Sequence, residues 1–116
     1  MSSQERRKHE RHNLSYYLTV LDEKTQRVTG HLVDISTLGM MIDCKEPLPT
    51  GMDLKLRLEL TESIADKAFV PFTARVKWCR VDPIQPFLYN AGLEIVNIDA
   101  VDMKIIQSIA DKYSQQ

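Results

Sequence analysis

The first residues of the chain that could do chemistry are arginines close to its start. Arg6, Arg7 and Arg11 stand in the stretch ERRKHERHN. The spacing of four places Arg7 and Arg11 on one face of a helix, or on the same side of an extended chain about 13 Å apart. A guanidinium group grips phosphate through two parallel hydrogen bonds and also pairs with the O6/N7 edge of guanine. The stretch therefore indicates either a solvated arm without a partner or one half of a site for an anion.

A second group of polar residues stands about two dozen residues later, in the stretch DISTLG. Asp34 and Ser36 share one face of a short strand, opposite Ile35. A carboxylate accepts hydrogen bonds from donors such as guanine N1–H and N2–H₂, and a hydroxyl donates or accepts. Gly39 lets the chain turn where a side chain would obstruct a ligand or where φ must be positive. The alternative interpretation is an ordinary aspartate or serine turn that joins two strands.

Signatures of catalysis and of metal binding are weak. The sequence has no GxSxG, HExxH or P-loop motif and no paired carboxylates. His9 and His12 offer two metal ligands without a third, whereas stable sites need three or four. Cys44 and Cys79 stand outside any CxxC pair, and we interpret both as buried or half-buried free thiols in a reducing compartment. We therefore expect no enzyme activity, no resident cofactor and no metal site.

Length and composition indicate one globular domain. The chain has 116 residues, of which 43% are hydrophobic and 27% charged. No apolar run approaches the ~18–20 residues that span a bilayer, and no signal-peptide segment follows the first residues. The expectation is a soluble, cytoplasmic protein without membrane insertion.

The formal charge of −1 conceals an asymmetry between the start of the chain and the rest. The first dozen residues carry four basic and two acidic side chains, which gives +2, whereas the remainder carries 11 basic and 14 acidic side chains, which gives −3. Long nucleic acids bind surfaces that neutralise many phosphates, so no DNA or RNA partner is expected. A basic arm on a mildly acidic body suits a small ligand with two charges better.

Strands must position most of these residues. They are expected at 16–21, 31–35, 40–44, 53–60, 72–81 and 88–98, with turn residues between them. Leucines alternate strictly with charged residues in 53–60, which makes it the clearest half-buried strand. In 72–81, alternation places Val76 and Trp78 inward and Lys77 and Cys79 outward. Gly92 in the last strand indicates a bulge or a close approach.

The end of the chain predicts a helix over about 99–113. Asp99 is placed to cap it. Its apolar stripe at i, i+4 spacing consists of Val101, Ile105, Ile109 and Tyr113. Six antiparallel strands followed by one helix indicate a mainly all-β fold, a small barrel capped by its C-terminal helix.

Taken together, the two polar stretches resemble the PilZ domain family. The double signature of that family, RxxxR followed by (D/N)xSxxG, is filled here by Arg7, Arg11, Asp34, Ser36 and Gly39. The stretches AxVxW, which ends at Trp78, and YxxGLEI, around Gly92, are also similar to the family. The resemblance covers nearly the whole chain, because the order and spacing of the motifs match the strand pattern from Glu5 to the final helix.

The resemblance implies a six-stranded antiparallel β-barrel of PilZ type with a C-terminal helix over 14–116, preceded by a flexible basic arm over 1–13. It also implies binding of the bacterial second messenger bis-(3′-5′)-cyclic dimeric GMP (cyclic di-GMP). By the family pattern, Arg7 and Arg11 clamp phosphate and guanine. Asp34 and Ser36 contact a guanine edge, and Gly39 leaves room for the ligand.

Two further residues take roles from the same resemblance. An arginine directly before RxxxR is associated in the family with binding of two stacked ligand molecules. Arg6 fills that position, so two molecules of cyclic di-GMP per protomer are expected. Trp78 is a further candidate ligand contact, although its alternation equally assigns it to the core.

The implied mechanism is a ligand-driven ordering of the arm. A ligand with two phosphates supplies the anionic partner that orders the arm over the barrel. Because the sequence shows no output domain, regulation of a process such as motility or biofilm formation is expected to act through a downstream protein. Two alternatives stay open: a PilZ-like adaptor that binds no nucleotide, and a small-barrel nucleic-acid binder. The sequence disfavours the nucleic-acid binder, because it contains no strip of aromatic and basic residues on which bases could stack.

Overall fold

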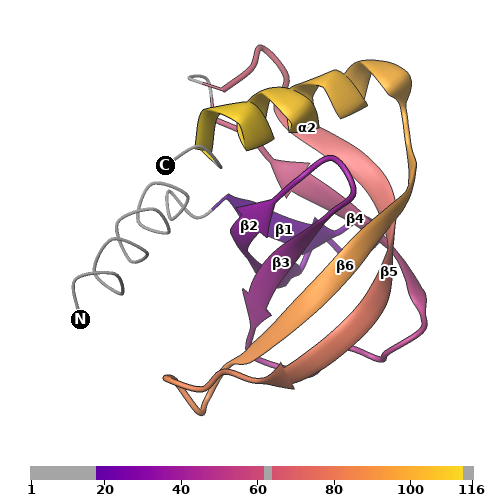
Figure 1. The fold of residues 1–116 in the computed structure, drawn as a ribbon. Helices are drawn as coiled ribbons and strands as arrows, with labels where there is room; N and C mark the ends of the chain where they lie inside the picture. Colours follow the sequence, from indigo (N-terminus) through magenta and orange to yellow (C-terminus); the bar gives the residue numbers. More distant parts are fainter. Residues whose placement is uncertain (1–17, 62–63, 114–116) are drawn as a thin grey trace, which may run out of the picture.

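The computed structural model describes residues 18–61 and 64–113, and this part of the chain forms six strands and one helix. In chain order they are β1 (Thr19–Asp22), β2 (Val28–Ile35), β3 (Gly39–Cys44), β4 (Asp53–Glu59), β5 (Phe69–Val81), β6 (Tyr89–Ile98) and α2 (Ala100–Tyr113). The strands pair antiparallel and close into a barrel in the order β1-β2-β3-β6-β5-β4 (Figure 1). The expected mainly all-β fold, a six-stranded antiparallel barrel with a C-terminal helix, is confirmed.

The barrel interior is filled by side chains that alternate along the strands. In β4, Leu56 and Leu58 are buried, whereas Lys55 and Glu59 on either side of them are exposed and Arg57 between them is half-buried. The period of two in this stretch of sequence therefore corresponds directly to the inner and outer faces of the barrel. Burial of a leucine side chain contributes about 1.5–3 kcal/mol, so this strand is one of the main sources of stability.

A β-bulge in β5 changes which side chains face the interior. The register shifts between Val76 and Trp78, which pair with the consecutive residues Leu93 and Gly92 of β6. After the bulge, Cys79 packs against the core, and Trp78 is half-buried over Gly92. The predicted orientation, with Trp78 inward and Cys79 outward, is therefore wrong, because one extra residue reverses the alternation.

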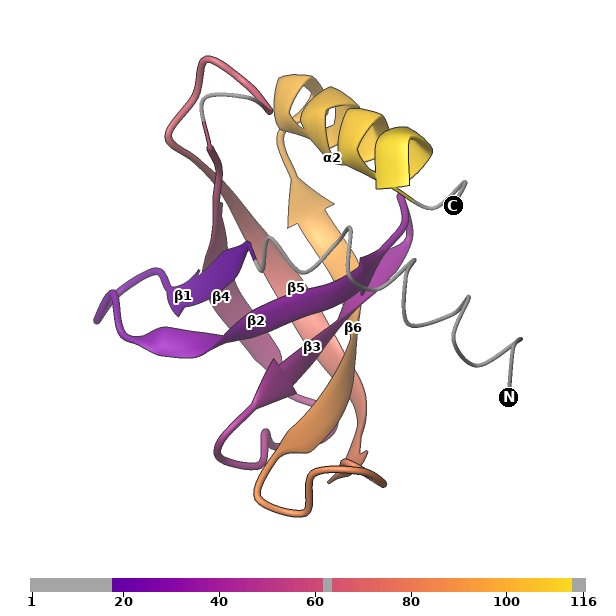
Figure 2. The same ribbon diagram turned by 90° about the vertical axis from the view of Figure 1, so that its left-hand side faces the viewer.

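Helix α2 lies across one end of the barrel (Figures 1 and 2). As predicted, Asp99 caps it, since its carboxylate accepts the N–H of Val101 at 3.0 Å. The buried face consists of Asp102, Ile106, Ile109 and Ala110. Val101, from the predicted stripe, is instead 65% exposed, because a stripe at i, i+4 drifts around a helix of 3.6 residues per turn. Across residues 18–61 and 64–113, no helix has the length and apolar character needed to traverse a bilayer.

The buried carboxylate of Asp102 is only 2% exposed and forms an ion pair with Lys67, from the segment between β4 and β5. A buried carboxylate without a partner would carry a large desolvation cost. The ion pair therefore compensates the buried negative charge of Asp102, and it joins α2 to the segment between β4 and β5.

Candidate ligand-binding site

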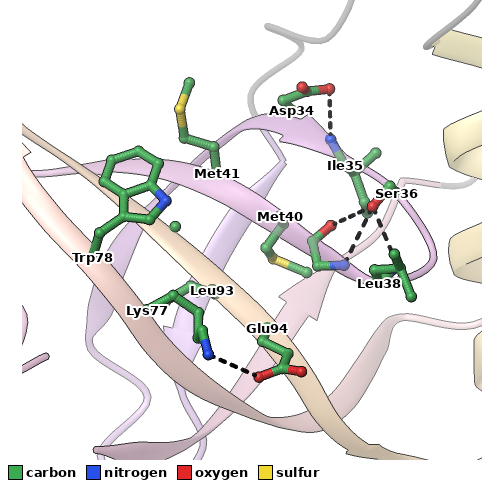
Figure 3. Close-up of a pocket in the computed structure, with 12 residues that line it drawn as sticks. Asp34, Ile35, Ser36, Leu38, Met40, Met41, Lys77, Trp78, Leu93 and Glu94 are labelled. Carbon is green, nitrogen blue, oxygen red and sulfur yellow. Dashed lines mark hydrogen bonds and ion pairs between the residues drawn. The ribbon is translucent and has the colours of Figure 1, made fainter. Parts of the chain in front are cut away.

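A hollow of about 460 Å³ lies on the outside of the barrel, where the β2–β3 turn meets β3, β5 and β6 (Figure 3). We call this hollow the pocket. Its volume falls within the range of about 300–1,000 Å³ that is usual for small-molecule sites. Four of the residues predicted from the sequence line it together: Asp34, Ser36, Gly39 and Trp78. The three motifs of the barrel that the sequence singles out, DISTLG, AxVxW and YxxGLEI, thus meet in one place.

The predicted arginines cannot be placed in the same way. Arg6, Arg7 and Arg11 lie outside the described residues, as do His9 and His12. The basic arm predicted over 1–13 lies outside them as well. The geometry of the site is therefore built below from the barrel alone.

The turn between β2 and β3 is held together by Ser36. Its hydroxyl accepts the N–H groups of Leu38 and Gly39 at 3.2 and 3.3 Å and donates to the carbonyl of Gly39 at 3.4 Å. The backbone N–H of Ser36 donates to the same carbonyl at 2.8 Å. The side chain thus forms a serine turn of the kind considered from the sequence, and it fixes the end of β2 that carries Asp34.

Asp34 faces the pocket as an exposed carboxylate. A bulge between Leu32 and Asp34 precedes it, and after the bulge Ile35 is buried in the core while Asp34 and Ser36 point to solvent. One carboxylate oxygen, Oδ1, accepts the N–H of Ile35 at 2.9 Å (Figure 3). Within the described part of the chain no cation pairs with Asp34. This carboxylate can therefore accept hydrogen bonds from a bound molecule.

Two glycines give the pocket its shape. A Cβ atom on Gly39 would collide with the backbone carbonyl of Leu93, so this glycine allows β3 and β6 to approach closely. The φ angle of Gly39 is not positive, so the glycine is not required here for a left-handed backbone conformation, which was one of the two reasons considered from the sequence. A Cβ atom on Gly92 would collide with the indole of Trp78, which confirms the close approach predicted there.

An apolar wall forms one side of the pocket. Met41 and Trp78 belong to the strands on either side of β6, and both are paired with Gly92. Both side chains are half-buried and line the pocket (Figure 3). The guanidinium of Arg80 stacks over the indole at 4.4 Å from the ring centroid and holds it in place. A flat aromatic ligand could stack against such a wall.

The charges that line the pocket are mainly acidic. Asp34 and Glu94 are carboxylates, and Lys77 is the single cation among the described residues that line it. Lys77 Nζ lies 3.7 Å from Glu94 Oε1, and both side chains are about half exposed (Figure 3). An anionic ligand would therefore need additional cations from elsewhere in the protein.

Several lining residues were not predicted as site residues from the sequence, among them Met41, Lys77 and Glu94. Lys77 was expected on the outer face of its strand, but nothing in the sequence alone joined it to Asp34. The sequence alone does not reveal the strand register that brings them together. In that register Glu94 of β6 pairs with Gly39 of β3 on one side and with Arg75 of β5 on the other. Only the paired sheet brings these side chains to the same hollow as the DISTLG turn.

The comparisons with known proteins agree with this architecture. The family model of the PilZ domain matches residues 5–112. The chain belongs to the PilZ domain family. The match spans the RxxxR stretch, the barrel and nearly all of α2, so the resemblance seen in the sequence is confirmed.

Two solved structures share the fold at low sequence identity. The Bacillus subtilis inhibitor of motility (MotI/DgrA) matches with a TM-score of 0.67 and 19% identity over 85% of this chain, which is 46% of that protein. The PilZ domain of YcgR from Escherichia coli, determined with cyclic di-GMP, matches with a TM-score of 0.60 and 14% identity over 85% of this chain and 82% of that one. The chain thus spans less than half the length of the Bacillus protein. No curated protein matches its sequence.

Proposed function

We propose that this PilZ domain is a cytoplasmic receptor for cyclic di-GMP that signals to a partner protein and catalyses no reaction. The observation that carries the proposal is the meeting of Asp34, Ser36, Gly39 and Trp78 in one pocket. The YcgR domain, which has the same fold, was determined with this ligand, and this supports the choice of ligand.

The barrel side of the site would recognise guanine. Asp34 offers to the N1–H and N2–H₂ donors of a guanine edge a carboxylate that pairs with no cation among the described residues. Ser36 fixes the turn that presents this carboxylate, and Gly39 keeps the strands close enough for the pocket to form. Trp78 and Met41 provide the wall on which a base stacks.

The phosphates would be met by the arm. The residues that line the pocket include two carboxylates and one lysine, so they repel rather than attract a doubly charged anion. Arg7 and Arg11 are the cations that the family pattern assigns to this task, and a guanidinium holds phosphate bidentately. Arg6, directly before them, would admit a second stacked molecule, which gives two ligands per protomer.

Output would follow from ordering of the arm over the barrel. A ligand that contacts the arm and the DISTLG turn at once favours the ordered state by its differential affinity. The surface made by the arm, the ligand and the barrel would then engage a downstream protein. The shared fold with an inhibitor of motility makes motility a reasonable process to examine first.

Isothermal titration of the full chain with cyclic di-GMP tests the proposal. We expect heat with a stoichiometry near two, and Arg7→Ala or Asp34→Ala should weaken binding at least about tenfold, because each removes a charge-assisted hydrogen bond. Arg6→Ala should lower the stoichiometry to one. Trp78 is the sole tryptophan of the chain, so its fluorescence should change during the same titration.

Matched variants separate specific loss from general damage. Arg27→Ala and Asp111→Ala remove exposed charges of the same kinds outside the pocket and should leave the affinity unchanged. Gly92→Val should abolish binding and alter the Trp78 spectrum, because its side chain would enter the space of the indole. A flat titration of the unaltered chain at tens of micromolar ligand would contradict the proposal and favour a nucleotide-free adaptor.

A further inference from the structure

The loop that joins β5 to β6 exposes large apolar side chains. Ile84 is 73% exposed, Phe87 82% and Val81 52%. We call residues 81–88 the hairpin tip. It projects from the end of the barrel opposite to α2 (Figures 1 and 2). None of its residues lines the pocket, so the tip is a separate feature of the surface.

Hydrogen bonds give the hairpin tip a defined shape. The carboxylate of Asp82 accepts the N–H groups of Ile84 and Gln85 at 2.7 and 2.9 Å. The backbone closes the loop twice, from Asp82 N–H to the carbonyl of Leu88 and from Leu88 N–H to the carbonyl of Gln85, each at 2.9 Å. Two prolines in the sequence DPIQP restrict the backbone further. The tip therefore presents Ile84 and Phe87 in a preorganised arrangement, which lowers the entropic cost of binding.

Exposure of these apolar side chains to water is unfavourable, and a partner that covered them would gain the free energy of their burial. Burial of one large apolar side chain contributes substantially to an interface, and a few anchors of this kind carry most of the affinity of a typical complex. Isolated exposed apolar residues are common, but two on one constrained loop form a protruding anchor. The chemistry of its surroundings narrows the class of partner.

Two classes of occupant fit poorly. A second copy of this chain that meets tip to tip would bury a few hundred Å² at most, whereas a stable interface needs about 800 Å² from each partner. A bilayer surface is generally bound through clusters of Lys and Arg beside the apolar residues. The tip contains no Lys or Arg between positions 81 and 88, and its one charge is the carboxylate of Asp82.

We propose that the hairpin tip is a docking element that inserts Ile84 and Phe87 into an apolar cleft of a partner protein. A cleft surrounds a protruding tip and buries these side chains on several sides, which a flat surface does not. The contact does not involve the pocket, so it does not depend on cyclic di-GMP as the ligand. The tip continues β5 and β6, whose residues Trp78 and Gly92 line the pocket, and the two sites therefore share one hairpin.

Photo-crosslinking followed by a binding measurement tests the proposal. The full chain is produced in its source cells with p-benzoylphenylalanine at position 87, or at the exposed position 107 of α2 as a control. We expect a discrete adduct from position 87 only, which excess unaltered chain competes away and excess I84S/F87S chain does not. The crosslinked protein is then purified and titrated with the unaltered chain, with I84S/F87S and with the matched control Val101→Ser, which alters an exposed apolar residue on α2.

The expected result is a loss of affinity of at least about 30-fold for I84S/F87S and no change for Val101→Ser. Equal adducts at positions 87 and 107, no adduct, or a purified partner that binds I84S/F87S as tightly as the unaltered chain would overturn the proposal. So would tip-dependent cosedimentation with phosphatidylglycerol vesicles or tip-dependent self-association in sedimentation velocity. Titration of I84S/F87S with cyclic di-GMP should match the unaltered chain, so failure here is distinct from failure of the proposed ligand.

Discussion

The pocket and the hairpin tip share strands β5 and β6, yet they present apolar side chains in opposite ways. In the pocket, Met41 and Trp78 line a hollow, and the absence of a side chain on Gly92 lets the indole pack closely over it. At the tip, Ile84 and Phe87 protrude from a loop that hydrogen bonds hold in shape. A hollow with a carboxylate at its edge suits a small molecule, whereas a protrusion suits a complementary cleft. Exposure alone therefore does not indicate the kind of partner; shape and neighbouring polar groups do.

The largest expected effect is a difference in the free energy of unfolding between a variant of the hydrophobic core and a variant of the tip. Leu58→Ala should lower the free energy of unfolding by about 2–5 kcal/mol, because Leu58 is fully buried and its truncation leaves a cavity. Phe87→Ser should change that free energy by no more than about 0.5 kcal/mol, because the ring is mostly in water already. Urea denaturation followed by circular dichroism measures both.

This pair of variants can break the comparison. If Phe87→Ser destabilised the fold as strongly as Leu58→Ala, the tip would be packed against the barrel in solution, and its apolar side chains would serve stability. A small effect, with the affinity for cyclic di-GMP unchanged, would leave the tip as a surface whose apolar character serves neither the core nor the pocket.

A medium effect is expected at the rim of the pocket. Glu94→Gln should tighten binding of cyclic di-GMP about three- to tenfold at low salt, because it removes a carboxylate that repels phosphate and releases Lys77 from its ion pair. Lys77→Gln should weaken binding by a similar factor. Both changes should shrink at high ionic strength, since the side chains are about half exposed and therefore screened.

The control for this prediction is Glu59→Gln, which removes an exposed carboxylate of β4 outside the pocket. Calorimetric titration at two salt concentrations compares the three variants. An equal gain from Glu59→Gln would show that only net charge matters. No change from Glu94→Gln would mean that the ligand phosphates lie away from this side of the pocket.

Much of the architecture follows from local sequence patterns. Alternation within the strands, clearest in the leucines of β4, and the turn residues between them predict all six strands in order. This works because inner and outer faces of the barrel differ at every second residue. Asp34 and Ser36 were expected on one face, opposite Ile35, and in the structure both are exposed whereas Ile35 is buried. Their common turn is a short-range feature, so no distant part of the chain is needed to predict it.

Other features depend on contacts between distant segments. The bulge that turns Trp78 away from the core arises from pairing with β6, and no period in the sequence of β5 signals it. Lys77 and Glu94 reach the pocket only through the register of three strands. Val101 was assigned to the buried face of α2, but the end of the barrel selects the face that carries Ile106. The tip residues Ile84 and Phe87 fall within a stretch that indicates only a turn.

The smallest effect concerns the base of the hairpin tip, where Cys44 of β3 pairs with Tyr89 at the start of β6. Its thiol donates to the carbonyl of Tyr89 at 3.7 Å, and Tyr89 pairs with Val81 at the edge of the tip. Burial raises the pKa of Cys44 from 9.0 to about 11, with smaller contributions from Cys79 and Asp43. The native chain therefore keeps a proton that the unfolded chain releases above pH 9.

Because the native state binds this proton more tightly, stability should be complete below pH 9 and should fall as the pH rises to 11. At pH 10 the loss from this one group should be about 1 kcal/mol. Urea denaturation under reducing conditions at pH 8 and pH 10 should show it for the unaltered chain, and less of it for Cys44→Ala. The same pH slope in both chains would mean that Cys44 ionises freely. The base of the tip would then be open to water, and the tip would lack a packed support beneath it.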